Sequence, residues 1–295
     1  MSKNNAESIR ARLLNIAKTE NSDFQVILIR YSLERFLYRI SISDYAHRFL
    51  LKGALLFSLW YEMSHRSTRD IDLLAYGESD LKSMDIIFKN IAKINFDDGL
   101  IFHHDKIVVE DIRKNTGYVG ARVIIQAELA KARVRIQIDI GFGDAVTPKA
   151  MIETFPVILK DFPAARLRAY PVYTVIAEKL HAIALLGMSN SRLKDYFDLL
   201  ILFQREKLNS AILSEAIFAT FTRRKMQVTN KTLIGLSDEF SNDLSKQLIW
   251  NAFLKNNQLE ERPLSSVISI LKKNLEPILE MVAAKMKKIK SELLI

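Results

Sequence analysis

The sequence predicts an α+β fold, in which a mixed sheet is flanked by helices and followed by an all-helical region. Apolar residues recur at helical spacing through residues 1–48, which indicates helices before the sheet. Between residues 106 and 140, segments rich in Val and Ile alternate with period two, which indicates strands. From Thr174, the expected N-cap, the spacing is helical to the C-terminus, and Gly187 is the expected end of the first helix there.

Prolines mark the expected division of the chain. Residues 155–171 hold three of the six prolines, so we expect an irregular linker and a domain boundary there. The expected parts are N-terminal helices that pack on the core (1–48), a core domain (49–160) and a helical C-terminal domain (161–295).

Composition narrows the class of protein. A chain of 295 residues with 49% hydrophobic residues can bury a large core. Lys and Arg number 43 against 34 Asp and Glu, a net charge of +9 that favours polyanionic partners, with nucleic acid the leading candidate. The absence of cysteine excludes disulfides, thiol catalysis and cysteine-ligated zinc. No apolar run approaches the ~20 residues of a membrane span, so we expect a cytoplasmic protein without a membrane partner.

Helix-forming segments at the N-terminus also carry arginines. The apolar stripes of residues 1–48 leave these side chains for an ordinary solvated face, which we favour over an RNA-binding surface. The arginines are Arg10, Arg12, Arg30, Arg35 and Arg39.

The central motif of the chain is a pair of aspartates on a predicted strand. Asp70 and Asp72 alternate with Ile71 and Leu73, so the two carboxylates point to one face while the apolar side chains enter the core. Neighbouring carboxylates repel unless a cation lies between them, and oxygen ligands of this type suit Mg²⁺. The motif therefore predicts a magnesium site.

The segment before this strand adds a phosphate-binding element. Residues 49–52 form a predicted buried strand, Gly53 a turn, and residues 54–62 a helix whose N-terminus offers unpaired N–H groups. A phosphate beside metal-binding carboxylates is the arrangement that a nucleoside triphosphate requires.

A third carboxylate ends the predicted strand 133–140. Val134, Ile136 and Ile138 face one side of this strand, so Asp139 faces the other, and glycines follow it directly. Asp139 is either an ordinary strand-end aspartate or a further metal ligand, and the presence of Asp70 and Asp72 favours the metal ligand.

Two predicted helices in the C-terminal half of the chain carry further charged candidate site residues. Lys179 lies on the same apolar helix face as Val175 and Ile183. Its side chain therefore either extends so that the ammonium group reaches solvent, or the ammonium group binds an anion. In residues 190–199, apolar side chains collect on one face and charged side chains on the opposite arc, which by itself is typical of a salt-bridged surface. These charged side chains are Arg192, Lys194, Asp195 and Asp198.

Taken in order, four motifs resemble the nucleotidyl transferase AbiEii/AbiGii toxin family, whose fold is similar to that of polymerase-beta-type nucleotidyltransferases. The motifs are residues 49–53 with 67–73, residues 137–144, residues 177–180 and residues 190–198. The sequence departs from the family at Ala54, where a second Gly or a Ser is usual; backbone contacts to phosphate survive this change, and a hydroxyl contact does not.

This resemblance implies roles for individual residues. Asp70, Asp72 and Asp139 would hold Mg²⁺, Lys179 would meet the triphosphate, and Asp195 would join these four as catalytic. The nucleotide-binding residues would be Lys52, Gly53, Arg69, Lys179, Arg192, Lys194, Asp195 and Asp198.

The resemblance also implies a biological role. It indicates the toxin of a toxin–antitoxin or phage-defence pair, with a cognate antitoxin. The toxin would transfer a nucleoside monophosphate from an NTP to an RNA acceptor, with the tRNA 3′ end as the expected acceptor, and so block translation. Two alternatives stay open: NTP-dependent nucleotidylation or phosphorylation of a protein, and a nucleotide-binding module without turnover.

Overall fold

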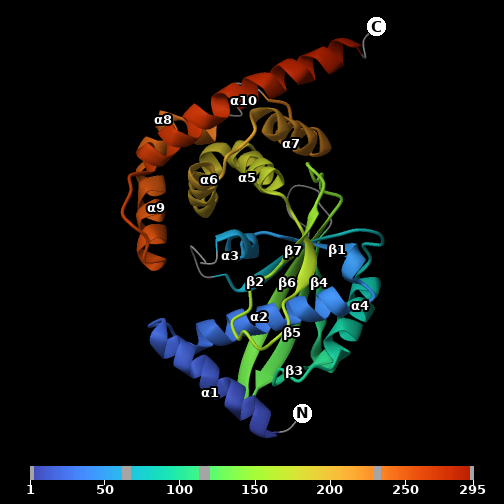
Figure 1. Ribbon diagram of the computed structural model, residues 1–295. Helices are drawn as coiled ribbons and strands as arrows, with labels where there is room; N and C mark the ends of the chain where they lie inside the picture. The colour runs from blue at the N-terminus through green and yellow to red at the C-terminus, as the bar shows by residue number, and fades with distance from the viewer. Residues whose placement is uncertain (1–2, 62–67, 113–119, 229–233, 293–295) are drawn as a thin grey trace. The chain divides into compact units, whose positions relative to one another are not determined.

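The computed structural model describes residues 3–61, 68–112, 120–228 and 234–292, and the chain divides into two compact units. Figure 1 shows the elements coloured along the chain. The first unit contains Met1–Gly143 and Met151–Ala169, and the second contains Asp144–Ala150 and Tyr170–Ile295. The first unit thus extends to Ala169.

Helices precede and interrupt the strands of the first unit. The helices are α1 (Lys3–Thr19), α2 (Phe24–Ile42), α3 (Leu55–Tyr61) and α4 (Leu81–Lys93), with short 3₁₀ turns η1 (Ala46–Arg48) and η2 (His104–Lys106). The strands are β1 (Phe49–Lys52), β2 (Asp70–Ala75), β3 (Leu100–Phe102), β4 (Val108–Asp111), β5 (Gly120–Leu129), β6 (Ala132–Phe142), β7 (Met151–Thr154) and β8 (Arg166–Ala169).

Within the described residues these strands form one mixed sheet in the order β3-β5-β6-β2-β1-β8-β7, with β4 also paired to β5. Strands β4, β5 and β6 lie in the region where the sequence predicts strands, and β5 pairs antiparallel with both β4 and β6. Strand β2 then lies parallel to β6 and antiparallel to β1. The mixed sheet expected from the sequence is confirmed.

One face of the sheet is apolar and buried. Ile71 and Leu73 of β2 and Ile136 and Ile138 of β6 point to this face and are at most 1% exposed. Helices α2 and α4 contact the strands, α2 at β6 and α4 at β5 (Figure 1). The alternate positions carry polar side chains on the opposite side, which we call the polar face: Lys52, Asp70, Asp72, Arg122, Gln137 and Asp139.

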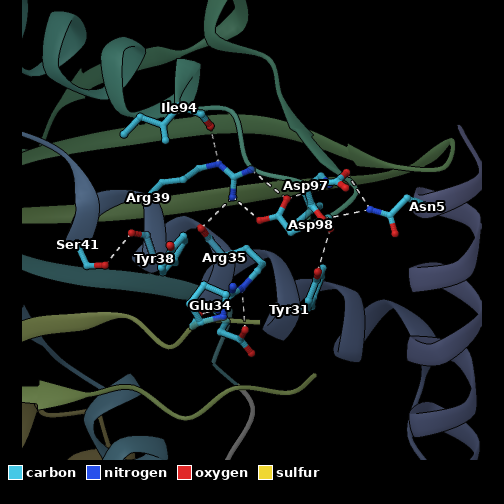
Figure 2. Close-up of polar contacts among 12 residues, drawn as sticks. Asn5, Tyr31, Glu34, Arg35, Tyr38, Arg39, Ser41, Ile94, Asp97 and Asp98 are labelled. Carbon is cyan, nitrogen blue, oxygen red and sulfur yellow. Dashed lines mark hydrogen bonds and ion pairs between the residues drawn. The ribbon is translucent and has the colours of Figure 1, made fainter. Parts of the chain in front are cut away.

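Helix α2 contains buried charged residues, which we call the α2 network (Figure 2). Arg39 donates from Nη1 to Asp98 Oδ2 at 2.6 Å and from Nη2 to Oδ1 at 3.0 Å, while its Nε donates to the Ile94 carbonyl. Arg35 Nε lies 2.8 Å from Glu34 Oε1. The expectation of a solvated arginine face is therefore wrong for Arg35 and Arg39, which are 0% and 1% exposed.

The α2 network also fixes the segment between β7 and β8. Glu34 Oε2 accepts from the Ile158 N–H at 2.6 Å, and Arg35 Nη2 donates to the Pro163 carbonyl at 2.8 Å. The same guanidinium lies 5.6 Å from the ring centroid of Phe162. The expected irregular linker is thus anchored, and part of it, Arg166–Ala169, forms β8 parallel to β1.

The second unit is helical in its described elements, as expected from the sequence. These elements are α5 (Val172–Leu186), η3 (Gly187–Ser189), α6 (Lys194–Arg205), α7 (Ser210–Arg223), α8 (Asp238–Asn242), α9 (Leu244–Asn256) and α10 (Leu264–Glu292). Helix α10 contacts α6, α7 and α8. It continues without a break through Pro277.

Helix α5 is the core helix of this unit and contacts α6 and α7. It begins at Val172 with Pro171 as N-cap, so the expected cap Thr174 lies in the first turn, where its hydroxyl donates to the Thr147 carbonyl at 2.8 Å. Gly187 ends the helix with a φ of +48°, as expected. By length and apolarity Val172–Ser189 could cross a bilayer, but its packing against two helices and its ion-paired Lys179 are those of a core helix.

Candidate active site

The predicted metal-binding carboxylates lie in one row across the polar face. Asp72 of β2 is in register with Lys52 of β1 on one side and with Asp139 of β6 on the other. Asp139 is in turn opposite Arg122 of β5. We call these four residues the charge row. The structure thus brings two of the predicted aspartates to adjacent positions, and Asp70 lies two residues before Asp72 on the same face, opposite Gln137.

Gly53 makes room for one of these carboxylates. Its φ is +74°, a conformation that L side chains rarely adopt. A Cβ at this position would lie 2.0 Å from Asp72 Oδ2 and 2.6 Å from Asp72 Cγ. The glycine is therefore required twice, for the turn after β1 and for the close approach of the Asp72 side chain.

Arg122 holds the third carboxylate. Its Nε donates to Asp139 Oδ1 and its Nη2 to Asp139 Oδ2, both at 2.8 Å, which is a bidentate ion pair. The hydrogen bond to Asp139 raises the pKa of Arg122, against burial, which lowers it, and the charge of Asp70 raises it further. The sequence analysis did not identify Arg122 as a site residue. The available signal was its position on the neighbouring strand β5, directly opposite Asp139.

The expected Mg²⁺ requires oxygen ligands, which the carboxylates of the polar face offer. Asp70 and Asp72 offer partly buried oxygen ligands on one face, and the missing Cβ of Gly53 leaves space beside Asp72. Both oxygens of Asp139 accept from Arg122. Among the described residues, no three His, Cys, Asp or Glu side chains gather as a metal-binding group. The carboxylates of Asp70 and Asp72 are therefore donors of the kind that Mg²⁺ binds, and Asp139 is a donor of the same kind whose two oxygens accept from Arg122.

The other predicted nucleotide-binding residues of the first unit surround β1 and β2. Lys52 ends β1 opposite Asp72, and Arg69 is exposed directly before β2. The described part of helix α3 has seven residues. The dipole of so short a segment is too weak to indicate a phosphate site at its N-terminus. Ser67, part of the sequence motif, lies outside the described residues.

In the second unit, Lys179 binds two of the other predicted site residues. Its Nζ donates to Asp195 Oδ1 at 2.8 Å and to Asp198 Oδ2 at 2.7 Å. Burial opposes the ammonium charge, but the two carboxylates outweigh it and raise the pKa of Lys179. Of the two roles open to Lys179 from its position, the structure therefore shows the anion-bound one, with protein carboxylates as the anions.

This contact changes the interpretation of α6. The side chains of Asp195 and Asp198 are 1% and 2% exposed, so the predicted salt-bridged surface is wrong for these two residues. Arg192 is half-exposed, with its Nε 3.2 Å from Asp195 Oδ2, and Lys194 is exposed. The structure thus brings Lys179, Arg192, Asp195 and Asp198 together and leaves Lys194 at the surface.

A second buried cluster in this unit contains Arg224. Its Nη2 lies 3.0 Å from Asp144 Oδ1 and 3.3 Å from Glu178 Oε1, and its Nη1 lies 3.2 Å from His181 Nδ1. Burial, followed by the charge of Arg224, lowers the pKa of His181 to about 4. His181 is therefore neutral at pH 7, and Arg224 ties α5 to the segment Asp144–Ala150.

Comparisons with known proteins complete these observations. Among curated proteins, no match was found. JHP933 from Helicobacter pylori is similar in structure, with 16% identity, a TM-score of 0.47, and coverage of 88% of this chain and 92% of that chain. A second H. pylori structure, described as a candidate nucleotidyltransferase, has 16% identity, a TM-score of 0.46, and coverage of 86% and 93%.

The family is established by the sequence itself. A family model described as the AbiEii nucleotidyl transferase toxin of type IV toxin–antitoxin systems matches residues 35–279, a range that includes most of both units. This match confirms the family expected from the four motifs, and the mixed sheet with its flanking helices and helical second unit confirms the expected fold class. The chain therefore belongs to the AbiEii nucleotidyl transferase toxin family.

Proposed function

We propose that this protein is a Mg²⁺-dependent toxin that transfers a nucleoside monophosphate from an NTP to the 3′ end of tRNA and so blocks translation. The observation that carries the proposal is the placement of Asp70 and Asp72 on the polar face, with Asp72 beside Gly53 and in register with Asp139. The reaction joins the acceptor hydroxyl oxygen to the α-phosphorus, releases pyrophosphate and frees the hydroxyl proton.

Asp70 and Asp72 would hold the metal, and Asp139 would join them. Bound Mg²⁺ would neutralise phosphate charge and stabilise the developing charge on the leaving pyrophosphate. Lys52 and Arg69 supply positive charge near the same strand, and we propose that both contact the nucleotide. The turn at Gly53 lets Asp72 keep its position while the backbone approaches closely.

For the second unit, we propose that Lys179, Arg192, Lys194, Asp195 and Asp198 bind nucleotide. Lys179 donates to both Asp195 and Asp198 in this structure, so a phosphate at Lys179 would share its ammonium group with these two carboxylates. Arg192 and Lys194 are exposed.

The RNA acceptor is supported by charge. The net charge of +9 favours a polyanion, and Arg133 and Arg135 are exposed on β6 in phase with Asp139, on the polar face. The tRNA 3′ end is proposed from the family resemblance. Since NTP and tRNA are cytoplasmic, we propose that the toxin acts in the cytoplasm, countered by a cognate antitoxin.

The proposal is tested by incubating the purified protein with each α-³²P-labelled NTP and total cellular RNA. We expect label on RNA of tRNA size, dependent on Mg²⁺ and removed by enzymes that degrade the 3′ end. Label on protein alone would favour protein nucleotidylation, and nucleotide binding without pyrophosphate release would favour a binding module. Either result would overturn the proposal.

Salt dependence gives a second test of the RNA acceptor. If the protein contacts backbone phosphates, RNA affinity should fall about a thousandfold between about 50 and 200 mM salt for six or more neutralised phosphates. Arg133→Glu with Arg135→Glu should weaken RNA binding and leave NTP affinity unchanged. RNA affinity that does not change with salt would contradict the acceptor assignment.

A further inference from the structure

Arg122 is the member of the charge row that lies outside the family motifs quoted above. It reaches across from β5 and donates to both oxygens of Asp139 at 2.8 Å. Gln137 adds a second acceptor when its amide oxygen faces the guanidinium, 3.1 Å from Nε and 3.2 Å from Nη2. Arg122 is therefore held in one orientation, against the third carboxylate of the proposed metal site.

The charges on this face explain why a cation is useful here. Asp70, Asp72 and Asp139 share one face of neighbouring strands, and like charges at such positions destabilise a sheet. Arg122 neutralises Asp139 directly, and its charge also interacts with Asp70. The protein thus carries its own cation at the carboxylate that the family resemblance assigns to Mg²⁺.

A divalent cation at Asp139 would have to compete with this arginine. Two cations that share one carboxylate repel each other, and the repulsion doubles when one of them is divalent. The bidentate pair also needs both carboxylate oxygens in one plane with the guanidinium, so a carboxylate that turns toward another ligand gives up part of the pair. Asp139 is 21% and Arg122 34% exposed, so water can replace the lost contacts.

We propose that Arg122 controls metal binding at this site by holding Asp139, so that a divalent cation gains its third carboxylate only when Arg122 releases it. The proposal rests on the proposed function, because it takes Asp70 and Asp72 as the other metal ligands. Arg122 acts through Asp139 and is therefore a positioning residue.

The test measures Mn²⁺ binding alone, by the EPR signal of free Mn²⁺, with no nucleotide, acceptor or turnover. Arg122→Gln should bind Mn²⁺ about tenfold more tightly than the wild type, a change of about 1.4 kcal/mol that is within the range of one hydrogen-bonded charge pair. Arg122→Lys keeps the positive charge but lacks the paired N–H donors of the guanidinium. Its Mn²⁺ affinity should lie between those of the wild type and Arg122→Gln. It also serves as the second variant if Arg122→Gln does not fold.

Two controls separate release of Asp139 from a general change in charge. Arg166→Gln removes the same charge from an exposed position of β8 and should leave Mn²⁺ affinity within about twofold of the wild type. In an Asp139→Asn background, Arg122→Gln should have no further effect, because the residue through which it acts is gone.

The outcomes for Arg122 are distinct from those for the metal site. Unchanged or weaker Mn²⁺ binding by Arg122→Gln, or an increase that persists in the Asp139→Asn background, overturns the role of Arg122. The metal assignment is judged by Asp72→Asn, which should lose Mn²⁺ affinity; if it binds as the wild type does, or if no protein in the series binds Mn²⁺, the metal assignment fails and the role of Arg122 fails with it.

Discussion

The α2 network and the charge row contain the same kinds of residue and differ in their contact with water. Arg39 and Asp98 are 1% and 0% exposed, and Arg39 also donates to the carbonyls of Ile94 and Arg35. Arg122 and Asp139 form an equally regular pair but remain 34% and 21% exposed. Ion-pair geometry alone does not distinguish these two regions; burial does.

The difference shows which pair can exchange partners. Separating a fully buried pair leaves a charge with neither water nor a counter-ion, at a cost of several kcal/mol, so the α2 network behaves as a fixed part of the core. Separating a partly exposed pair costs far less, because water solvates both groups. The α2 network is therefore part of the fold, and the proposed chemistry belongs to the charge row.

The largest expected change in stability follows from breaking the α2 network. Asp98→Ala leaves the Arg39 guanidinium buried without its carboxylate and should lower the free energy of unfolding by about 3–5 kcal/mol. Urea denaturation measures this change. Asp105→Ala is the matched control, since Asp105 is exposed and its loss should cost no more than about 0.5 kcal/mol. Equal losses in the two variants would contradict the structural role of the network.

A similar loss is expected in the second unit. Lys179→Met removes the cation that Asp195 and Asp198 share, leaves Asp195 only its contact with the half-exposed Arg192, and should destabilise the protein by about 3 kcal/mol, measured by urea denaturation. Lys194→Met, at the exposed start of α6, should change the free energy of unfolding by no more than about 0.5 kcal/mol. A fully stable Lys179→Met variant would show that the two carboxylates do not depend on this lysine.

The sequence predicted the charge row better than the α2 network, for a physical reason. Strand alternation places Asp70 and Asp72 on one face with few alternatives, and it places Asp139 on the polar face of its own strand, but the register of Asp72 with Asp139 comes from the pairing of β2 with β6, which the sequence does not show. The burial of Arg39 depends on Asp98, which is 59 residues away, and helical periodicity cannot identify such a partner. The burial of Asp195 and Asp198 likewise depends on Lys179 of another helix.

Short strands were the other part that the sequence did not predict. Strand β8 has four residues between prolines, so its period-two pattern is too brief to outweigh the turn signals around it. Strand β3 has three residues. Both strands form because neighbouring strands, β1 for β8 and β5 for β3, offer pairing partners.

The α2 network should also respond to pH. Burial raises the pKa of Glu34 to about 7, against Arg35, which lowers it. Because the folded state holds this proton more tightly than the unfolded chain, the free energy of unfolding should fall as pH rises from about 4.5 to about 7, by at most about 3 kcal/mol. Glu34→Gln, which stays neutral, should lack this fall in urea denaturation across the same range.

His181 supplies the opposite slope and must be compared in both proteins. Its pKa is lowered to about 4, so its contribution to stability rises with pH from about 4 to about 6.5. That contribution is common to the wild type and Glu34→Gln and cancels in their difference. Parallel pH profiles of the two proteins would show that Glu34 does not titrate in this range.

A smaller change in stability is expected at Gly53. Gly53→Ala places a Cβ against the Asp72 carboxylate in a left-handed conformation, and the backbone strain should cost about 1–2 kcal/mol. Gly77→Ala is the matched control, because Gly77 has a φ of +86° and the atoms nearest to a Cβ there belong to the Arg48 guanidinium, the closest at 3.3 Å. Both variants should lose similar stability in urea denaturation, and only Gly53→Ala should also lose pyrophosphate release. Equal activity in the two would contradict the role of Asp72.

We propose that the charge row performs the chemistry while the buried α2 network maintains the fold. This proposal is tested by the rate of pyrophosphate release by purified Asp72→Asn, measured together with its free energy of unfolding, and with Glu110→Gln, at an exposed position of β4 opposite Arg122, as the control. We predict a loss of about a thousandfold or more for Asp72→Asn, since several kcal/mol of transition-state stabilisation are removed, with unchanged or higher stability. A rate near that of the wild type would contradict the account.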